Sequence, residues 1–343
     1  WGQNDRNPPE LRSHARLLRN NGANAPGTFV DKTIEAGVSL EDMVGTGPLE
    51  SPLEYVLSFS SRFTDVDRDG HADLVIASDF GTSRIYWNNG NGTFSNGTAS
   101  ANFGTDENGM GLSVGDYDAD GLLDVFVTSI YHSDPPAAGH NENGNWGVSG
   151  NRLYRNNGNR TFSDATDAAG VRDGSWGWGT SFFDYDNDGS LDLITTNGFT
   201  TGAFADARPT LSKNDGSGMF TDVSMAAGIT DTDQGRGLLT FDYDNDGDLD
   251  VFIANNAAQP ILYRNDGGHE NNWLKLQLEG TASNRDAIGA LVTVSPGGEL
   301  PPMIREIDGG SNYLSQNDIV AHFGLANHAG VIESVSIRWP DGS

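Results

Sequence analysis

The chain has 343 residues, a formal net charge of -28 and no cysteine. This acidic excess excludes a nucleic-acid partner bound through clustered Lys and Arg, and the lack of Cys excludes disulfide frameworks, zinc-thiolate sites and thiol nucleophiles. No apolar run reaches 18 residues, so we expect no membrane insertion. The chain starts at Trp1 without a signal-peptide pattern, which we interpret as a mature or trimmed polypeptide.

Two short motifs alternate along the chain. The first has the form D-x-D-x-D-G-x-x-D, and its copies begin at Asp65, Asp116, Asp184 and Asp242. The second is an Asn-Asn-Gly or Asn-Asp-Gly turn, and its copies begin at Asn20, Asn88, Asn156, Asn214 and Asn265. In the three regular copies a Phe follows the turn Asn by 6 residues, and the next acidic motif begins 22 residues later. Length variation is confined to one segment of the unit, which is typical of a repeat array.

Each repeat unit is predicted to contain short strands. An apolar run follows every acidic motif, at residues 74–77, 125–128, 193–196 and 251–254. A further strand then leads into the Asn-Gly or Asp-Gly turn, for which we expect a two-residue type I′ hairpin. Four short strands in about 50 residues are typical of a propeller blade. No long stripe of period 3.6 supports a helical solenoid, so we predict an all-β propeller of four-stranded blades with about five visible units.

The acidic motifs predict calcium sites. Alternating carboxylates, a Gly for the turn and a ninth-position carboxylate gather hard oxygens around one point, as Ca²⁺ requires. The seventh position varies freely, as expected if only its backbone carbonyl binds. The predicted ligands are Asp65, Asp67, Asp69, His71 and Asp73; Asp116, Asp118, Asp120, Leu122 and Asp124; Asp184, Asp186, Asp188, Ser190 and Asp192; and Asp242, Asp244, Asp246, Asp248 and Asp250. We expect about four structural Ca²⁺ ions rather than Mg²⁺ or a catalytic metal. The alternative for any single copy is an ordinary Asp-Gly-rich turn.

Two insertions interrupt the regular unit, within residues 131–146 and 199–208. Their aromatic, Asn, Asp and His residues could bind a ligand on one face, or the insertions could simply pad the rim. Trp176 and Trp178 stand where the other units have apolar strand, so we interpret them as blade core or channel lining.

The sequence resembles a known combination of domains. The acidic loops are similar to those of FG-GAP or VCBS repeats, and residues 284–290, 305–310, 313–316, 322–325 and 337–342 resemble the ASPIC/UnbV domain. That arrangement is typical of the cartilage acidic protein family and its bacterial relatives. The resemblance implies a secreted, calcium-binding propeller, seven-bladed in the integrin-like case, at 1–271. It also implies a β-rich ASPIC/UnbV domain at 272–343, which we expect to be truncated at its C-terminal end.

The first functional hypothesis is a non-enzymatic extracellular or cell-surface adhesion module that binds protein, glycan or copies of itself. The second is a propeller enzyme acting on a polysaccharide, and the third is a subunit of an extracellular filament. The seven His residues show no H-E-x-x-H pattern, and no G-x-S-x-G elbow occurs. We therefore nominate no catalytic residue.

Overall fold

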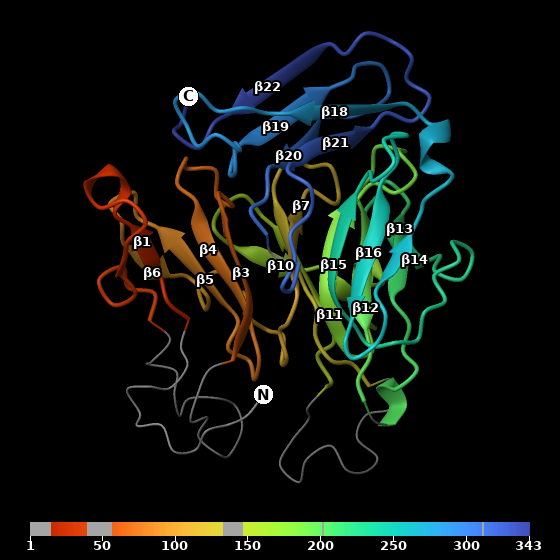
Figure 1. Cartoon of the computed structure of the whole chain (residues 1–343), viewed down its shortest axis with the longest axis horizontal. Coiled ribbons are helices and arrows are strands. Elements are labelled where there is room, and N and C mark those ends of the chain that lie inside the picture. Colours follow the sequence, from red (N-terminus) through yellow and green to blue (C-terminus); the bar gives the residue numbers. More distant parts are fainter. Residues whose placement is uncertain (1–14, 40–56, 133–146, 201, 311) are drawn as a thin grey trace.

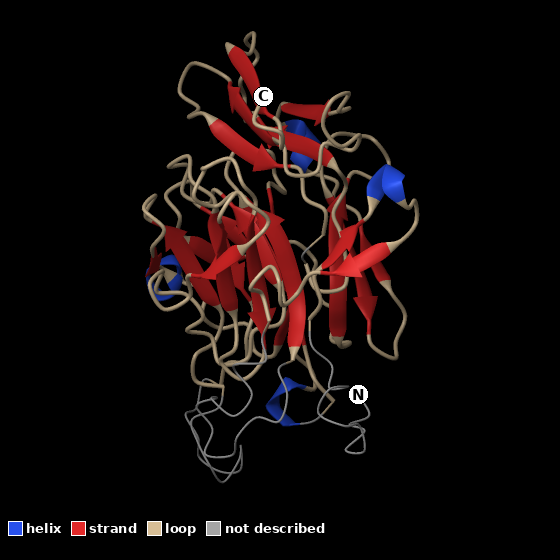
Figure 2. Cartoon of the chain, turned by 90° about the vertical axis from the view of Figure 1, so that its left-hand side faces the viewer, coloured by secondary structure: helices blue, strands red, loops and turns tan. Residues whose placement is uncertain are grey.

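The structure is a computed structural model that describes residues 15–39, 57–132, 147–200, 202–310 and 312–343. The described residues form antiparallel sheets joined by loops, with short helical pieces at α1 (Thr166–Ala169), η2 (Gly22–Asn24), η4 (Gly202–Phe204) and η5 (Gly268–Glu270) (Figure 2). The all-β prediction is confirmed. Among the helices of these residues, none is long and apolar enough to cross a membrane.

Three sheets have four strands, each paired in chain order. Blade 1 contains β3 (Ser58–Thr64), β4 (Asp73–Ser78), β5 (Arg84–Asn88) and β6 (Phe94–Asn96). Blade 2 contains β7 (Leu112–Gly115), β8 (Asp124–Val127), β9 (Arg152–Asn156) and β10 (Phe162–Asp164). Blade 3 contains β11 (Gly177–Phe183), β12 (Asp192–Asn197), β13 (Thr210–Asn214) and β14 (Phe220–Asp222). The expected four-stranded unit is thus present.

Two further sheets flank these blades in the sequence. Blade 4 has three strands, β15 (Gly235–Phe241), β16 (Asp250–Asn255) and β17 (Ile261–Tyr263), and a two-stranded sheet joins β1 (Leu18–Asn20) to β2 (Phe29–Asp31). The first strands of neighbouring blades lie close together, with β11 between β7 and β15 (Figure 1). A closed ring of seven blades stays a prediction.

The acidic motif joins the first and second strands of every blade. Its first Asp follows the end of the first strand, and its last Asp begins the second strand, as in the pair Thr64 and Asp73. The same register recurs in the pairs Gly115 and Asp124, Phe183 and Asp192, and Phe241 and Asp250. The four acidic loops therefore lie at one end of the blades.

The predicted two-residue hairpin between the third and fourth strands is wrong. Asn88 pairs with Phe94, so residues 89–93 form the connection. The Asn88 carboxamide oxygen accepts the Gly90 N–H at 3.0 Å, and the Asn89 N–H donates to the Thr93 carbonyl at 3.0 Å. Asn88 therefore starts a local Asx turn instead of occupying a type I′ turn.

The C-terminal residues form two small sheets that pack against each other. One pairs β18 (Trp273–Gln277) with β21 (Val320–Gly324), and the other has the order β20 (Met303–Glu306), β19 (Leu291–Ser295) and β22 (Ser334–Arg338). Their shared core includes Val292, Met303 and Phe323. These blue strands lie across one end of the blades in Figure 1. The boundary at 271/272 stays a prediction.

An aromatic cluster contains both tryptophans of the Gly174–Gly179 segment. Trp178 is buried and donates its indole N–H to the Gly198 carbonyl at 2.8 Å. Trp176 stacks on Phe199, with ring centroids 3.9 Å apart, and Phe204 packs against the same cluster. Trp178 is therefore part of the core, as expected, and the partly buried Trp176 packs against it together with part of the shorter insertion. Residues 133–146 of the longer insertion lie outside the described residues.

Candidate metal centres

Each acidic loop brings three carboxylates together. In loops 1 to 3 (residues 65–73, 116–124 and 184–192) the grouped residues are the first, third and ninth of the motif. In loop 4 (residues 242–250) they are the first, third and fifth. The groups, each with ligand atoms within 4.8 Å of one another, are Asp65, Asp67 and Asp73; Asp116, Asp118 and Asp124; Asp184, Asp186 and Asp192; and Asp242, Asp244 and Asp246.

The motif glycine fixes the first carboxylate of each loop. Gly70 has a φ of 94°, a conformation that favours glycine, and its N–H donates to Asp65 Oδ2 at 3.0 Å. The same bond joins Gly121 to Asp116, Gly189 to Asp184, and Gly247 to Asp242. One oxygen of the first carboxylate is thereby held by the backbone in every loop. The other oxygen remains for a ligand in Asp65 and Asp116, whereas in Asp184 and Asp242 it accepts the N–H of the fifth-position residue.

The ninth-position carboxylate is held by the second repeat motif. Asp73 Oδ1 accepts the backbone N–H of Asn88, the turn residue of the same blade, at 2.8 Å. Equivalent bonds join Asn156 to Asp124, Asn214 to Asp192, and Asn265 to Asp250. The two motifs recur together because the turn Asn positions the last carboxylate of the acidic loop.

Several carboxylate oxygens inside loops 1 to 3 have no hydrogen-bond donor among the described residues although they are buried. They are Asp65 Oδ1, Asp73 Oδ2, Asp116 Oδ1, Asp118 Oδ1 and Asp186 Oδ1. Burying an unpaired carboxylate costs several kcal/mol unless a cation or a proton compensates it. Convergent oxygens of this kind match the ligands that Ca²⁺ prefers. The residues present therefore fit a bound divalent cation.

The raised pKa values of two ninth-position carboxyl groups also fit a bound cation. Burial, with the nearby Asp67 and Asp65, raises the pKa of Asp73 to about 7. Burial, with the neighbouring Asp184, raises the pKa of Asp192 to about 9. Without an ion these groups tend to hold protons near neutral pH, because their charged forms are poorly solvated and repel one another.

Basic side chains contact the outer edges of loops 1 to 3. Arg155 contacts Asp118 at 2.5 Å and Asp120 at 2.7 Å, while Asp118 Oδ1 remains without a donor in the described structure. Arg160 contacts Asp67 and Asp69 in the same way, and Lys213 contacts Asp186 and Asp188. These cations compensate the outer oxygens and leave inner ones available.

The predicted fifth and seventh positions behave differently from the first, third and ninth. The fifth-position Asp69, Asp120 and Asp188 face Arg or Lys and are not part of the grouped carboxylates. The seventh-position side chains of His71, Leu122 and Ser190 lie against the turn glycines Gly90, Gly158 and Gly216. Metal binding by the seventh-position carbonyls stays a prediction.

Comparison with known protein families identifies segments of the chain that contain loops 1 to 3. The sequence model of the FG-GAP-like repeat matches residues 65–127 and 138–195, and that of ASPIC and UnbV matches residues 280–343. The chain combines FG-GAP-like repeats with an ASPIC and UnbV domain. Loop 4 lies outside both matched FG-GAP-like segments, so its identification depends on the repeat spacing and on its structure.

The chain is similar to vertebrate cartilage acidic protein 1. It is 28% identical to the Mus musculus protein over 331 residues, which cover 91% of this chain and 44% of that protein. It is also 28% identical to the Homo sapiens protein over 288 residues, which cover 79% of this chain and 39% of that protein. The chain thus spans about two fifths of the length of these relatives.

The region carrying the ASPIC and UnbV domain contacts three acidic loops directly. The Gly324 N–H donates to Asp184 Oδ2 at 3.1 Å, Lys275 Nζ contacts Asp242, and Arg338 contacts Asp65. These contacts reach loops 3, 4 and 1. Sequence reasoning missed them, because the partners are separated by up to 273 residues and share no local pattern.

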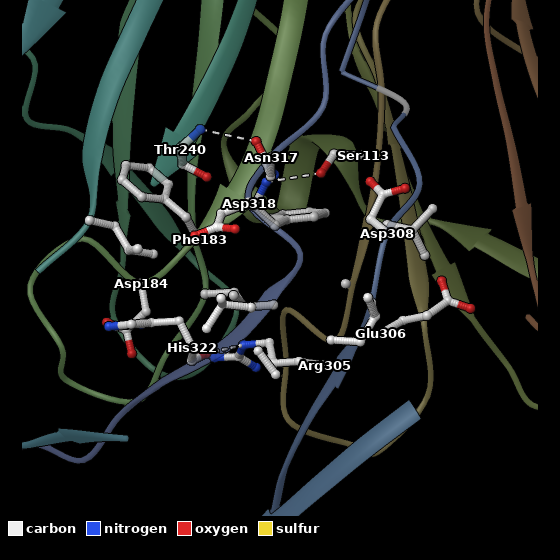
Figure 3. Close-up of a pocket in the computed structure, with 18 of the residues that line it drawn as sticks. Ser113, Phe183, Asp184, Thr240, Arg305, Glu306, Asp308, Asn317, Asp318 and His322 are labelled. Atoms are coloured by element: carbon white, nitrogen blue, oxygen red, sulfur yellow. Dashed lines mark hydrogen bonds between the residues drawn. The ribbon is translucent and has the colours of Figure 1, made fainter. Parts of the chain in front are cut away.

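A polar cavity of about 110 Å³ lies between this region and the first strands of the blades (Figure 3). Arg62 on β3 contacts Glu306 at 2.6 Å and Asp308 at 3.1 Å, and all three are largely buried. His322 Nε2 lies 3.0 Å from the Gly247 carbonyl, and burial lowers the pKa of His322 to about 4. Neutral His322 thus donates to loop 4. The charged residues of the cavity join β3 to the C-terminal region.

Two further carboxyl groups with raised pKa, those of Asp106 and Asp79, lie away from the acidic loops. Asp106 accepts hydrogen bonds from Ser83 Oγ at 2.6 Å and Tyr154 OH at 2.8 Å, and burial raises its pKa. Asp79 accepts a bond from Asn108 Nδ2 at 2.7 Å, and burial raises its pKa to about 6. Neither residue lines the cavity of Figure 3. Their bonds tie together the connections between strands of blades 1 and 2.

Proposed function

We propose that the chain is a calcium-stabilised interaction module of an extracellular protein, secreted or at the cell surface. The observation that carries this proposal is the set of buried, unpartnered carboxylate oxygens that converge in loops 1 to 3. A Ca²⁺ ion in each loop would supply the missing charge and connect the first and second strands of a blade. The FG-GAP-like repeats and the similarity to cartilage acidic protein 1 support the same assignment.

The ions serve stability in this proposal. Extracellular calcium modules bind with dissociation constants of about 10⁻⁴–10⁻³ M, and Arg155, Arg160 and Lys213 already compensate part of the charge of loops 1 to 3. Binding in this range suits a compartment with millimolar calcium. The stabilised blades then present surfaces for a protein, a glycan or a second copy of the chain.

An enzymatic role is not proposed. A polysaccharide-active enzyme would place a pair of carboxyl groups with separated pKa values in an accessible pocket. The pair with raised pKa outside the acidic loops, Asp79 and Asp106, is bonded to Asn108, Ser83 and Tyr154. The cavity carboxylates Glu306 and Asp308 are paired with Arg62.

The test compares thermal unfolding in EDTA, in calcium and in magnesium. Calcium at 2 mM should raise the melting temperature well above the value in EDTA, and magnesium should raise it less. Asp186→Ala, which removes one grouped carboxylate, should reduce the calcium response by about a quarter, whereas Asp266→Ala outside the groups should not. An identical melting temperature in EDTA and calcium would contradict a structural ion.

A glycan array and a pull-down in calcium buffer then search for the partner. Asp186→Ala serves as the control, because a partner that recognises the calcium-stabilised fold should bind this variant less. Turnover of a polysaccharide by the purified chain would contradict the proposed interaction module and support the enzyme hypothesis.

A further inference from the structure

The seventh position of loop 4 departs from the other three loops. There the residue is Asp248, whereas the seventh positions of loops 1 to 3 hold His71, Leu122 and Ser190. In those loops the side chain lies against a turn glycine. In loop 4 the equivalent turn continues into η5, and the Asp248 side chain lies against Gly268 and His269. A carboxylate therefore meets an imidazole at a point where the other blades have a simple packing contact.

The contact has the geometry of a set of metal ligands. His269 Nδ1 lies 3.0 Å from Asp248 Oδ2 and 3.6 Å from Asp246 Oδ2. Ligands at about 2.0–2.2 Å from one tetrahedral Zn²⁺ lie about 3.4 Å from each other, so the two distances bracket the expected value. The three ligand atoms lie within 4.8 Å of one another.

A second observation points to a ligand at this place. The Asp248 side chain is 0% exposed, and its Oδ1 has no hydrogen-bond partner among the residues that the structure describes. Asp248 Oδ2 also accepts the backbone N–H of His269 at 3.1 Å, which fixes the imidazole beside the carboxylate. Asp246 and His269 are partly exposed, at 34% and 42%, so an ion can enter from solvent.

We propose that Asp246, Asp248 and His269 bind a transition-metal dication such as Zn²⁺, next to the loop 4 carboxylate group, with which they share Asp246. An imidazole nitrogen favours Zn²⁺, Co²⁺ or Ni²⁺ over Ca²⁺, which prefers oxygen ligands only. Three protein ligands leave one tetrahedral position for water. Asp246 also belongs to the loop 4 carboxylate group, so it would bridge the two sites. Because η5 directly precedes β18, the ion would tie blade 4 to the C-terminal region.

The experiment titrates Zn²⁺ into untagged, metal-depleted protein in 2 mM calcium by calorimetry, and Co²⁺ by visible absorption. The expected result is one Zn²⁺ per chain at micromolar affinity and the intense bands of tetrahedral Co²⁺. His269→Ala and Asp248→Asn should each weaken Zn²⁺ binding at least tenfold, because each removes a direct ligand. His71→Ala, the seventh-position histidine of loop 1, is the matched control and should bind Zn²⁺ as the wild type does.

Other outcomes overturn the site. Zn²⁺ binding that survives in His269→Ala would show that the ion occupies an acidic loop. Absence of binding at 100 µM Zn²⁺ would reduce the contact of Asp248 and His269 to a hydrogen bond. His269 is exposed, so its variant should fold, and an unchanged calcium response in both variants would confirm that the calcium sites are intact.

Discussion

Asp73→Asn is the most informative change in loop 1. Asp73 is fully buried, its Oδ1 accepts the Asn88 N–H, and its Oδ2 has no donor within the described residues. Asparagine keeps the acceptor for Asn88 and places an N–H₂ group where Oδ2 stood, close to the grouped Asp65. The variant therefore removes a poorly solvated charge and one calcium ligand in a single step.

The magnitude follows from the shifted pKa. The pKa of Asp73 is about 7 in the folded chain, mainly because of burial, against about 3.9 in an unfolded one. This difference between the folded and unfolded pKa corresponds to at most about 4 kcal/mol in the free energy of unfolding at pH 8 in EDTA. Calcium at 2 mM with a dissociation constant of about 0.1 mM adds about 1.8 kcal/mol per site. Asp73→Asn should thus be more stable than wild type in EDTA, and calcium should narrow the difference.

Urea unfolding at pH 8, in EDTA and in calcium, measures both effects. Because the folded-state pKa of Asp73 is raised, the stability of the wild type in EDTA should fall as pH rises from about 4 to 7. The stability of the variant should fall less over the same pH range. Asp164→Asn is the control, since Asp164 accepts the Thr166 N–H outside any acidic loop and should respond equally in both buffers. A destabilised Asp73→Asn with an intact calcium response would refute a cation site in loop 1.

Two further predictions concern the C-terminal region. The wild type should lose up to roughly 3 kcal/mol of stability as pH falls from about 6.5 to 4, because burial lowers the pKa of His322 to about 4, and His322→Gln should keep a donor to Gly247 but abolish this loss. Urea unfolding at pH 5 and pH 8 measures the loss, and an equal change in the unfolding free energy of both proteins between the two pH values would contradict the prediction. Lys275→Met should lower stability by about 2 kcal/mol in EDTA and by less in calcium, because the buried Asp242 loses its ammonium partner and an ion can replace that charge; an equal loss in both buffers would mean that loop 4 binds no ion.

The strand order within a blade could be predicted because the information is local and repeated. The acidic motif and the apolar run after it determine where the first strand ends and the second begins, as in Thr64 and Asp73. The length of the hairpin between the third and fourth strands could not be predicted from its Asn-Gly or Asp-Gly dipeptide. The Asx turn at Asn88 competes with a type I′ turn, and Asn88 also has to reach Asp73.

The candidate sites were only partly predictable for a similar reason. The first, third and ninth positions of loops 1 to 3 meet as the spacing indicates, but the fifth positions face Arg or Lys from other segments. Arg160 in blade 2 reaches Asp67 in blade 1, a pairing that depends on how neighbouring blades pack. Asp248 did carry a local signal, since it is the one acidic seventh position in the four motifs.

The contact of Arg338 with Asp65 also has a consequence for biosynthesis. The two residues are 273 positions apart, so blades 1 to 4 are synthesised before the guanidinium that contacts loop 1 has been translated. Until then the nascent loop 1 carries its carboxylates without that partner. Strand β22, which carries Arg338, can therefore complete the contacts of loop 1 only after blades 1 to 4 have been synthesised.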